Sequence, residues 1–208
     1  DDNGNDTDYT IGTDGTIAAV ALEDGYGDEF GIIKGEEAYL NINTIIKNID
    51  KRFYVDATNN LVMFTDATKT YKTKIGGKTI NETENTDYVI SFMDGKNCYV
   101  NVKFVKKYVD FDYKVVKAEG KSPARIVLKY TSGEKNQMTV KSNIEMRTKA
   151  DYQNLIVTTL KKNTKVTVLE ESGDWTKVGT DDGFMGYVPA KKLKDKEIIT
   201  EIEAQNID

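Results

Sequence analysis

Four side chains in the C-terminal third of the chain have types and positions suited to binding a sugar or a peptide. Trp175, the only tryptophan, and Tyr187 lie on either side of an acidic turn within residues 172–189, and Asp174 precedes the tryptophan. Tyr152 lies in a polar stretch upstream. Aromatic rings stack on sugars and peptides, and a carboxylate accepts their hydrogen bonds. These four residues form a candidate ligand-binding site, and the alternative is that Trp175 and Tyr187 fill the core of a small β-barrel.

The residue types that several catalytic chemistries require are missing from the sequence. The chain has no histidine and a single cysteine, Cys98, so neither a Ser-His-Asp nor a Cys-His site can form. The common zinc sites also need His or clustered Cys. Cys98 lies in an apolar strand pattern, which favours a buried small hydrophobic residue over a reactive thiol. We therefore predict no catalytic residue, no metal site and no cofactor.

Acidic pairs are the remaining candidates for catalysis, because a glycosidase needs two carboxylates on either side of the scissile bond. The sequence contains three such pairs: Glu36–Glu37, Glu170–Glu171 and Asp181–Asp182. Neighbouring residues of a strand point to opposite faces of the sheet. The pairs are therefore interpreted as solvent-exposed turns.

Charge and hydropathy restrict the partners. Charged residues make up 30% of the chain with both signs mixed, and the net charge of -5 leaves no basic footprint for nucleic acid. A lysine-rich run at Lys191, Lys192, Lys194 and Lys196 indicates a solvent-exposed face, with contact to anionic wall polymers as the alternative. No apolar segment approaches the length that spans a bilayer. We expect a soluble monomer that does not insert into a membrane.

The elements that must position the aromatic site are short strands. Residues 175–178 and 184–188 form two β-prone runs around an Asp-Asp-Gly turn, which predicts a β-hairpin. Upstream, residues 138–140, 155–160 and 165–169 are predicted strands. A polar, turn-rich run at residues 132–137 is the predicted boundary with the first half of the chain. About five short strands without a long helix indicate a small β-barrel over residues 138–195.

This C-terminal half resembles a bacterial SH3-like domain. The resemblance is carried by Asn143 and Arg147, by residues 160–170, and by the two glycine-aromatic blocks of the hairpin. Asn163 stands where the family usually has Gly, and Asn also tolerates left-handed backbone geometry. The resemblance implies a non-catalytic targeting or spacer module of secreted bacterial proteins. In such domains a groove beside residues 148–154 would bind cell-wall peptide.

The first half contains an internal repeat with a spacing of 60 residues. Residues 35–42 and 95–102 share Gly, Tyr and Asn at equivalent positions, and the apolar positions keep their character. An apolar stripe after each block predicts a helix, which Asn41 or Asn43 would cap in the first copy and Asn101 in the second. Strands before and after each helix give two packed β-β-α-β-β units. The fold class is therefore mainly β with two short helices: an α+β duplicated domain followed by a small SH3-like barrel.

Residues 28–131 resemble the copper amine oxidase N-terminal-like domain of bacterial surface proteins. The repeated blocks at residues 35–42 and 95–102, each followed by its helix, carry this resemblance. The chain departs from the family's frequent Val-Pro before the helix, because Asn41 and Asn101 occupy those positions. No copper site is implied, since the chain lacks the soft and borderline ligands that copper prefers.

The two ends of the chain complete the expected organisation. Residues 1–27 have the Asp/Asn/Gly/Thr composition of a leader or linker that can include a strand, as after a signal peptide or membrane anchor. Residues 196–208 form a predicted tail, helical or leading to a further domain, with Ile198, Ile199 and Ile202 at helical spacing. The tandem resembles the amino-terminal region of surface glycoside hydrolases of the family 18 type from gut Firmicutes.

These observations favour a binding or spacer role over catalysis. The predicted function is recognition of cell-wall peptidoglycan or polysaccharide by an extracellular or surface protein of a Gram-positive bacterium. The first alternative is the N-terminal part of a surface glycoside hydrolase whose catalytic domain lies beyond this chain. The second alternative is a structural module that interacts with other proteins.

Overall fold

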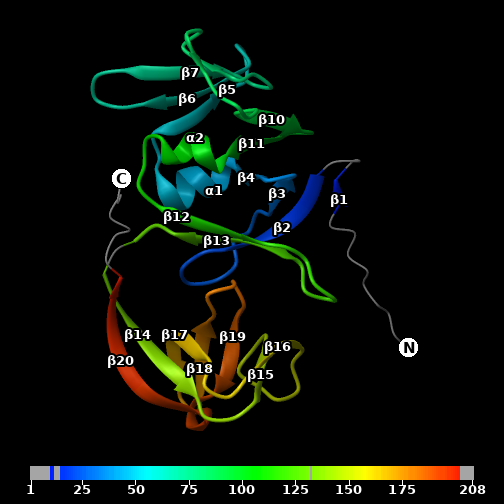
Figure 1. Cartoon of the computed structure of the whole chain (residues 1–208), viewed down its shortest axis with the longest axis vertical. Coiled ribbons are helices and arrows are strands. Elements are labelled where there is room, and N and C mark those ends of the chain that lie inside the picture. Colours follow the sequence, from blue (N-terminus) through cyan, green and yellow to red (C-terminus); the bar gives the residue numbers. More distant parts are fainter. Residues whose placement is uncertain (1–9, 12–14, 132, 202–208) are drawn as a thin grey trace. The chain divides into compact units, whose positions relative to one another are not determined.

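A computed structural model describes residues 10–11, 15–131 and 133–201. The chain divides into two compact units (Figure 1). The first comprises the residues up to Val20 together with Gly27–Tyr130, and the second comprises Ala21–Tyr26 and the residues from Thr131 onward. Strands account for 54% of the residues and helices for 9%, which confirms the predicted fold class.

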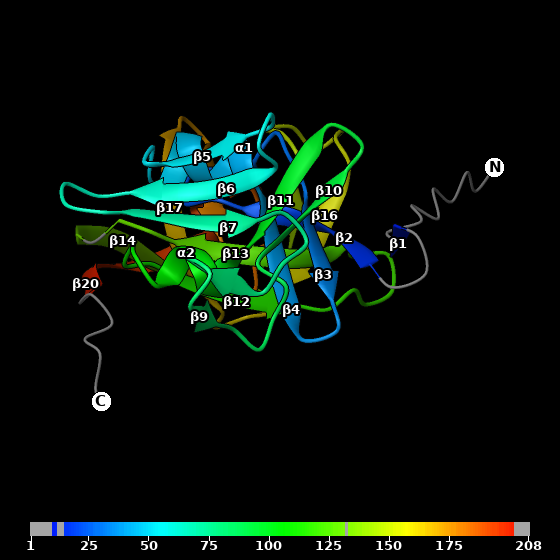
Figure 2. The same ribbon diagram turned by 90° about the horizontal axis from the view of Figure 1, so that it is seen from above.

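The first unit contains two sheets. The larger has, in spatial order, β10 (Ser91–Asp94), β11 (Asn97–Asn101), β4 (Glu37–Asn41), β3 (Gly31–Lys34), β2 (Gly15–Ala21), β13 (Ala124–Lys129) and β12 (Asp112–Val116), and β1 (Thr10–Ile11) pairs with β2. The smaller has β5 (Phe53–Asp56), β6 (Leu61–Thr65), β7 (Thr70–Lys74), β8 (Thr79–Ile80) and β9 (Glu84–Asn85), of which β5–β7 lie side by side in Figure 2. Strands β5 and β6, which follow the first helix, belong to the smaller sheet, whereas β12 and β13, which follow the second helix, belong to the larger one. The sequence predicts two alike units and not this difference.

The helices of this unit start at asparagine caps. Asn41 Oδ1 accepts a hydrogen bond from the Asn43 backbone N–H at 2.9 Å, and Asn101 Oδ1 accepts one from the Lys103 N–H at 2.9 Å. Such caps satisfy backbone donors that have no partner within the helix. Helix α1 (Ile42–Thr44) continues into the π-helical turn η1 (Ile45–Ile49), and α2 spans Val102–Lys106. The first helical segment reaches Ile49, the end of the first apolar stripe, whereas Val109 of the second stripe lies beyond the end of α2.

Strands β4 and β11 are related by a local twofold arrangement. They pair antiparallel with Leu40 directly opposite Val100, Tyr39 opposite Asn101, and Asn41 opposite Tyr99. The tyrosine of each repeat copy therefore lies opposite the asparagine of the other copy. The two asparagine caps consequently lie at equivalent positions on either side of one local axis.

Aromatic rings pack the small sheet against α2. The centroids of Phe53 and Phe64 lie 4.7 Å apart, and those of Phe104 and Tyr108 lie 5.3 Å apart. Phe64 stacks on Tyr108 with centroids 4.7 Å apart, so rings from the sheet and the helix form one cluster. Figure 1 draws the helices between the small sheet and the β12–β13 ribbon. Rings of this size supply much of the buried apolar area.

The second unit is a seven-stranded sheet with a 3-10 turn. Its spatial order is β16 (Ile156–Leu160), β15 (Ile144–Arg147), β19 (Met185–Pro189), β18 (Trp175–Gly179), β17 (Lys165–Ser172), β14 (Gly133–Val140) and β20 (Leu193–Glu201), with the turn η2 at Ala190–Lys192. Each of these strands contributes one buried side chain to a common core: Val140, Met146, Leu160, Val166, Val178, Val188 and Leu193.

Two segments of this unit differ in secondary structure from the sequence prediction. Gly133–Val140 form a strand in the run predicted to be turn-rich, although the two units divide close to it, between Tyr130 and Thr131. Strand β20 forms where a tail, helical or leading to a further domain, was predicted. The two strands pair over their length, with Asn136 opposite Ile198 and Lys135 opposite Ile199. Pairing the backbone groups of β14 outweighs a short apolar stripe that cannot stabilise a helix alone. Ile202 lies outside the described residues.

Residues Ala21–Tyr26 take part in the second unit, so the N-terminal segment is more than a linker. The Tyr26 hydroxyl donates to the Gly183 carbonyl at 3.0 Å and accepts from the Met185 N–H at 3.0 Å. Lys177 Nζ donates to the Asp24 carbonyl at 2.8 Å. These contacts fix the end of the β18–β19 hairpin opposite to Trp175.

Candidate ligand-binding site

The β18–β19 hairpin presents Trp175 and Tyr187 on its outer face. The predicted hairpin is confirmed, with Trp175 opposite Pro189 and Lys177 opposite Tyr187. Val178 and Val188 belong to the core of the unit, and side chains alternate between the faces of a strand. Trp175 and Tyr187 are half-buried on the face away from that core. The alternative in which they fill the barrel core is therefore wrong.

Hydrogen bonds shape the loop that carries Tyr152. The Thr148 N–H donates to the Leu155 carbonyl at 2.9 Å and closes the loop at its base. Arg147 Nη1 donates to the Asn154 carbonyl at 2.9 Å, and the Gln153 N–H donates to Asp151 Oδ1 at 2.8 Å. A loop that is tied at its base and at its tip positions its side chains with little loss of entropy on binding.

Tyr152 and Trp175 come together in an aromatic pair. Their ring centroids lie 4.8 Å apart with planes at 62°, an edge-to-face arrangement. Tyr152 remains 58% exposed, so one of its faces stays open to solvent. The structure thus joins two of the four predicted residues, one from the loop and one from the hairpin, into a single open aromatic surface.

The other two predicted residues lie at the border of this pair. Tyr187 is on the same face of the hairpin, directly opposite Arg147 on β15 and Lys177 on β18. Asp174 is exposed in the turn before Trp175, and its backbone carbonyl accepts a hydrogen bond from the Ala190 N–H at 2.8 Å. Neither side chain forms a hydrogen bond or a ring pair with Tyr152 in the part of the chain that the structure describes.

Sequence reasoning missed the apolar residues at the end of the loop. Leu155 is 78% exposed and the adjacent Ile156 is also exposed. Both residues fall within the predicted strand of residues 155–160, which does not predict their exposure. Their position directly after the polar loop could have indicated that their side chains do not reach the core. Both lie within four positions of Tyr152 in the sequence.

Gly186 holds β15 and β19 together beneath this surface. A Cβ atom at Gly186 would lie 2.5 Å from the Arg147 carbonyl oxygen and 2.7 Å from Met146 Cγ. The absence of a side chain at Gly186 allows the backbones of β15 and β19 to approach closely, because β15 occupies the space that a side chain would need.

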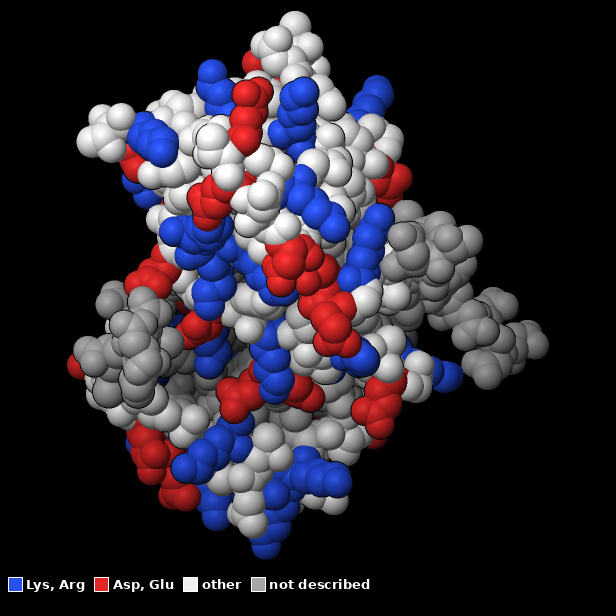
Figure 3. Space-filling view, turned by 45° about the horizontal axis from the view of Figure 1, so that its top comes forward, with Lys and Arg blue, Asp and Glu red and all other residues white. Residues whose placement is uncertain are grey.

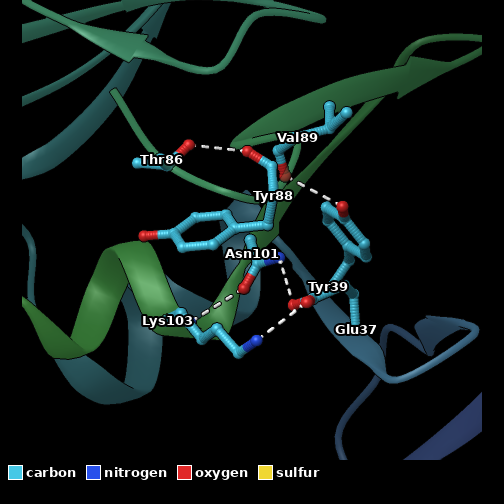
Figure 4. A network of polar contacts seen from close by, with 7 residues as sticks. All are labelled: Glu37, Tyr39, Thr86, Tyr88, Val89, Asn101 and Lys103. Carbon is cyan, nitrogen blue, oxygen red and sulfur yellow. Dashed lines mark hydrogen bonds and ion pairs between the residues drawn. The ribbon is translucent and has the colours of Figure 1, made fainter. Parts of the chain in front are cut away.

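A separate polar network lies in the first unit (Figure 4). Glu37 accepts hydrogen bonds from Asn101 Nδ2 at 3.0 Å and from Lys103 Nζ at 2.7 Å. Burial alone would raise the pKa of Glu37, but these two donors and the Lys103 charge lower it. The hydrogen bond that Lys103 donates to Glu37 raises the pKa of Lys103 in turn. The two side chains are paired with each other, so the pair is interpreted as a stabilising contact of the fold.

The remaining chemical candidates are structural or exposed. Cys98 is buried as predicted, and burial raises the pKa of its thiol to about 11. Glu171 pairs with Lys196 at 3.1 Å, and Asp182 accepts from the Thr180 hydroxyl at 2.5 Å. Among the described residues, no three acidic, His or Cys side chains cluster as metal ligands. The described helices are all too short or too polar to span a membrane.

Comparisons with known proteins identify the second unit. No solved structure matches the chain. The chain is 37% identical over 73 residues to "Probable endopeptidase p60" from Listeria monocytogenes, and the match lies in the second unit. It covers 34% of this chain and only 15% of the Listeria protein. The model of the bacterial SH3 domain matches residues 142–194. Residues 142–194 are therefore a bacterial SH3 domain.

Proposed function

We propose that this chain is a non-catalytic region that holds a secreted bacterial protein on the cell wall. Its SH3 domain would bind a peptidoglycan peptide or glycan at the surface formed by Tyr152, Trp175, Leu155 and Ile156. The observation that carries the proposal is the edge-to-face contact of Tyr152 with Trp175, with centroids 4.8 Å apart and Tyr152 open to solvent.

The chemistry of this surface suits a ligand with flat or apolar parts and hydrogen-bonding groups. Tyr152 and Trp175 offer ring faces and edges, and Leu155 adds exposed apolar area. Asp174 and Tyr187 can accept or donate hydrogen bonds at its border. Exposed apolar surface of this kind marks binding sites. A peptide stem and a sugar chain share these features.

Cell-wall pull-down tests the proposal. The full chain is mixed with purified insoluble peptidoglycan and sedimented, and Y152A is expected to reduce the bound fraction about tenfold, since one stacked ring contributes roughly 1–3 kcal/mol. Tyr54, 41% exposed on β5 of the first unit, provides the control variant Y54A, which should bind as the unchanged chain does. Equal retention of Y152A and Y54A would contradict the proposal. Digesting the glycan strands beforehand distinguishes peptide from glycan recognition.

A second candidate places this region beside a catalytic domain in a longer protein. The observation that favours it is the name of the Listeria relative, an endopeptidase most of whose length lies outside the match. The version predicted from the sequence is a family 18 type glycoside hydrolase. Assays of the full-length gene product for cleavage of peptide and of glycosidic bonds separate these two versions.

The first unit would then serve as a spacer or protein-interaction module. Its resemblance to the copper amine oxidase N-terminal-like domain, its origin by duplication and the extracellular location of the chain stay predictions. In the first unit, Glu37 is bonded within a polar network and the rings of Phe64 and Tyr108 pack on each other, which suits a spacer role.

A further inference from the structure

Three connections of the second unit meet at a surface made largely of lysines. The Lys141 N–H donates to the Lys192 carbonyl at 2.9 Å, and Lys141 Nζ donates to the Lys191 carbonyl at 2.9 Å. The Asn163 N–H donates to the Val140 carbonyl at 2.8 Å, which ties the third connection to the first. We call this surface the lysine end and define it by Lys141, Lys161, Lys162, Lys165, Lys191, Lys192 and Lys194.

Strand register brings two of these lysines to the same outer face. Thr139 on β14 lies directly opposite Lys165 on β17 and also opposite Lys194 on β20. Directly paired residues of antiparallel strands point to the same side of the sheet. The neighbouring Val140 faces the core, so Thr139 and both lysines face solvent.

The lysines of the lysine end are not paired with carboxylates. Across the described ranges, none of its seven lysines forms an ion pair with an acidic side chain. Glu145, the nearest acid along β15, pairs with Arg147 at 2.5 Å, and Asp195 follows Lys194 at the edge of the cluster. Elsewhere the two signs of charge are mixed: in Figure 3, basic (blue) and acidic (red) side chains alternate over most of the face drawn. The lysine end is thus a local positive field on a chain of net charge -5.

We propose that the lysine end binds a linear polymer that carries repeating phosphate groups. Several ammonium groups at one surface repel one another, and a polyanion relieves that repulsion while it releases its counterions. Lysine is a point charge on a flexible stem, and it binds phosphate without a fixed bidentate geometry. The cluster contains no arginine, so it suits recognition of charge density along a polymer.

Two other polyanions fit the surface less well. A nucleic-acid strand is usually held by aromatic side chains that stack on its bases, and the lysine end has no aromatic residue. A membrane surface is usually held by apolar side chains that enter the lipid, and the residues between the lysines are small or polar: Ser142, Asn143, Asn163, Thr164 and Ala190. A phosphate polymer requires neither feature.

This inference does not depend on the proposed function, because its residues are separate from the aromatic pair. The two surfaces adjoin at η2, where the Asp174 carbonyl accepts from the Ala190 N–H. A loss of binding at one surface can therefore be told from a loss at the other by variants of Tyr152 and variants of the lysines.

The test uses long-chain inorganic polyphosphate as the probe and the full chain as the protein. The variant K161Q/K162Q/K191Q/K192Q removes four charges without touching Lys141, whose amine bonds the backbone. The control K51Q/K74Q/K78Q/K96Q removes four charges from exposed, unpaired lysines of the first unit, so both variants carry a net charge of -5 - 4 = -9. We expect the unchanged chain and the control to bind alike, and the lysine-end variant to bind at least about tenfold more weakly.

Salt dependence provides the second readout. The logarithm of the affinity should fall linearly with the logarithm of the salt concentration, and the slope should be smaller in the lysine-end variant. The proposal is overturned by three results: no binding of the unchanged chain at low salt, equal loss in both variants, or tighter binding to phosphatidylglycerol vesicles or to a DNA oligonucleotide than to polyphosphate. Thermal unfolding of both variants shows that they are folded.

Discussion

Tyr152 and Trp175 lie 23 positions apart in the sequence, yet their rings meet edge to face with centroids 4.8 Å apart. The contact joins the tied loop of residues 148–155 to the start of β18. It leaves Tyr152 largely open to solvent on the outer face of the SH3 domain. A surface residue that makes one such contact is expected to contribute little to the stability of the fold.

The aromatic pair predicts different stability costs for its two members. Y152A should lower the free energy of unfolding by less than about 1 kcal/mol, because Tyr152 is mostly exposed. W175A should cost about 1–3 kcal/mol, because Trp175 is half-buried opposite Pro189. Urea unfolding followed by far-UV circular dichroism measures both values. A larger cost for Y152A than for W175A would show that the loop supports the fold.

Gly186 predicts a strong packing effect within the SH3 domain. G186A should destabilise the domain by several kcal/mol, roughly 3 or more, because its Cβ would meet the Arg147 carbonyl oxygen at 2.5 Å. Gly179 on the neighbouring strand is the matched control, since a Cβ there meets only Leu169 and Met185 side chains at 3.5 Å. G179A should change the stability by less than about 1 kcal/mol. Thermal unfolding of the two variants checks the contrast, and equal melting temperatures would refute it.

Glu37 predicts a pH dependence of the stability of the first unit. Its folded-state pKa is lowered, so its contribution is present above its unfolded-state pKa of 4.5 and is lost as the pH falls through the folded value. E37Q should therefore reduce the stability by roughly 1 kcal/mol near pH 7 and have less effect near pH 3. E36Q, at an exposed neighbouring position, is the control. Urea unfolding at the two pH values measures the difference.

Acid unfolding of the first unit will not be abolished by E37Q. Asp50, Asp56 and Asp66 also have lowered pKa values, because of hydrogen bonds from Arg52, from Asn59 and from the Thr68 backbone N–H respectively. They retain their own pH dependence in the variant. An E37Q chain with the same loss of stability on acidification as the unchanged chain would contradict the role given to Glu37.

The two asparagine caps predict unequal costs at equivalent positions. N41A should cost about 1 kcal/mol, the usual value of a helix cap. N101A should cost about 1–2 kcal/mol more, since Asn101 also donates to Glu37 at 3.0 Å and its loss leaves that carboxylate short of a donor. Besides its cap bond, Asn41 donates from Nδ2 to Glu29 and Asn97 at the longer distance of 3.4 Å. Equal unfolding free energies for the two variants would argue against the network.

Much of the second unit could be predicted from its sequence because local signals and the fold agree. The acidic turn before Phe184 sets the hairpin, and Asn163 adopts the left-handed backbone conformation expected of it, with φ of 71°. The tail could not be predicted, because Ile198 and Ile199 fit both a helical stripe and a strand. The decision depends on the backbone of β14, which is distant in the sequence.

The candidate site was found only in part for the same reason. Trp175 and Tyr187 suit a core or a surface equally well by residue type, and only the register with Val178 and Val188 assigns them to the outer face. The exposure of Leu155 could not be predicted, because an apolar residue in a predicted strand is usually expected to be buried. In the first unit, the strands after the two helices belong to different sheets because they pair with different partners, β13 with β2 and β5 with β6, and these pairings could not be predicted from local sequence.

The most direct test of the central claim uses the fluorescence of Trp175, the single tryptophan of the chain. The full chain, Y152A and Y54A are titrated with soluble cross-linked peptidoglycan fragments. We predict a saturable change in emission for the unchanged chain and Y54A, and an affinity about tenfold lower for Y152A. No saturable change in the unchanged chain, or the same affinity in Y152A, would contradict the assignment of the cell-wall ligand to this aromatic pair.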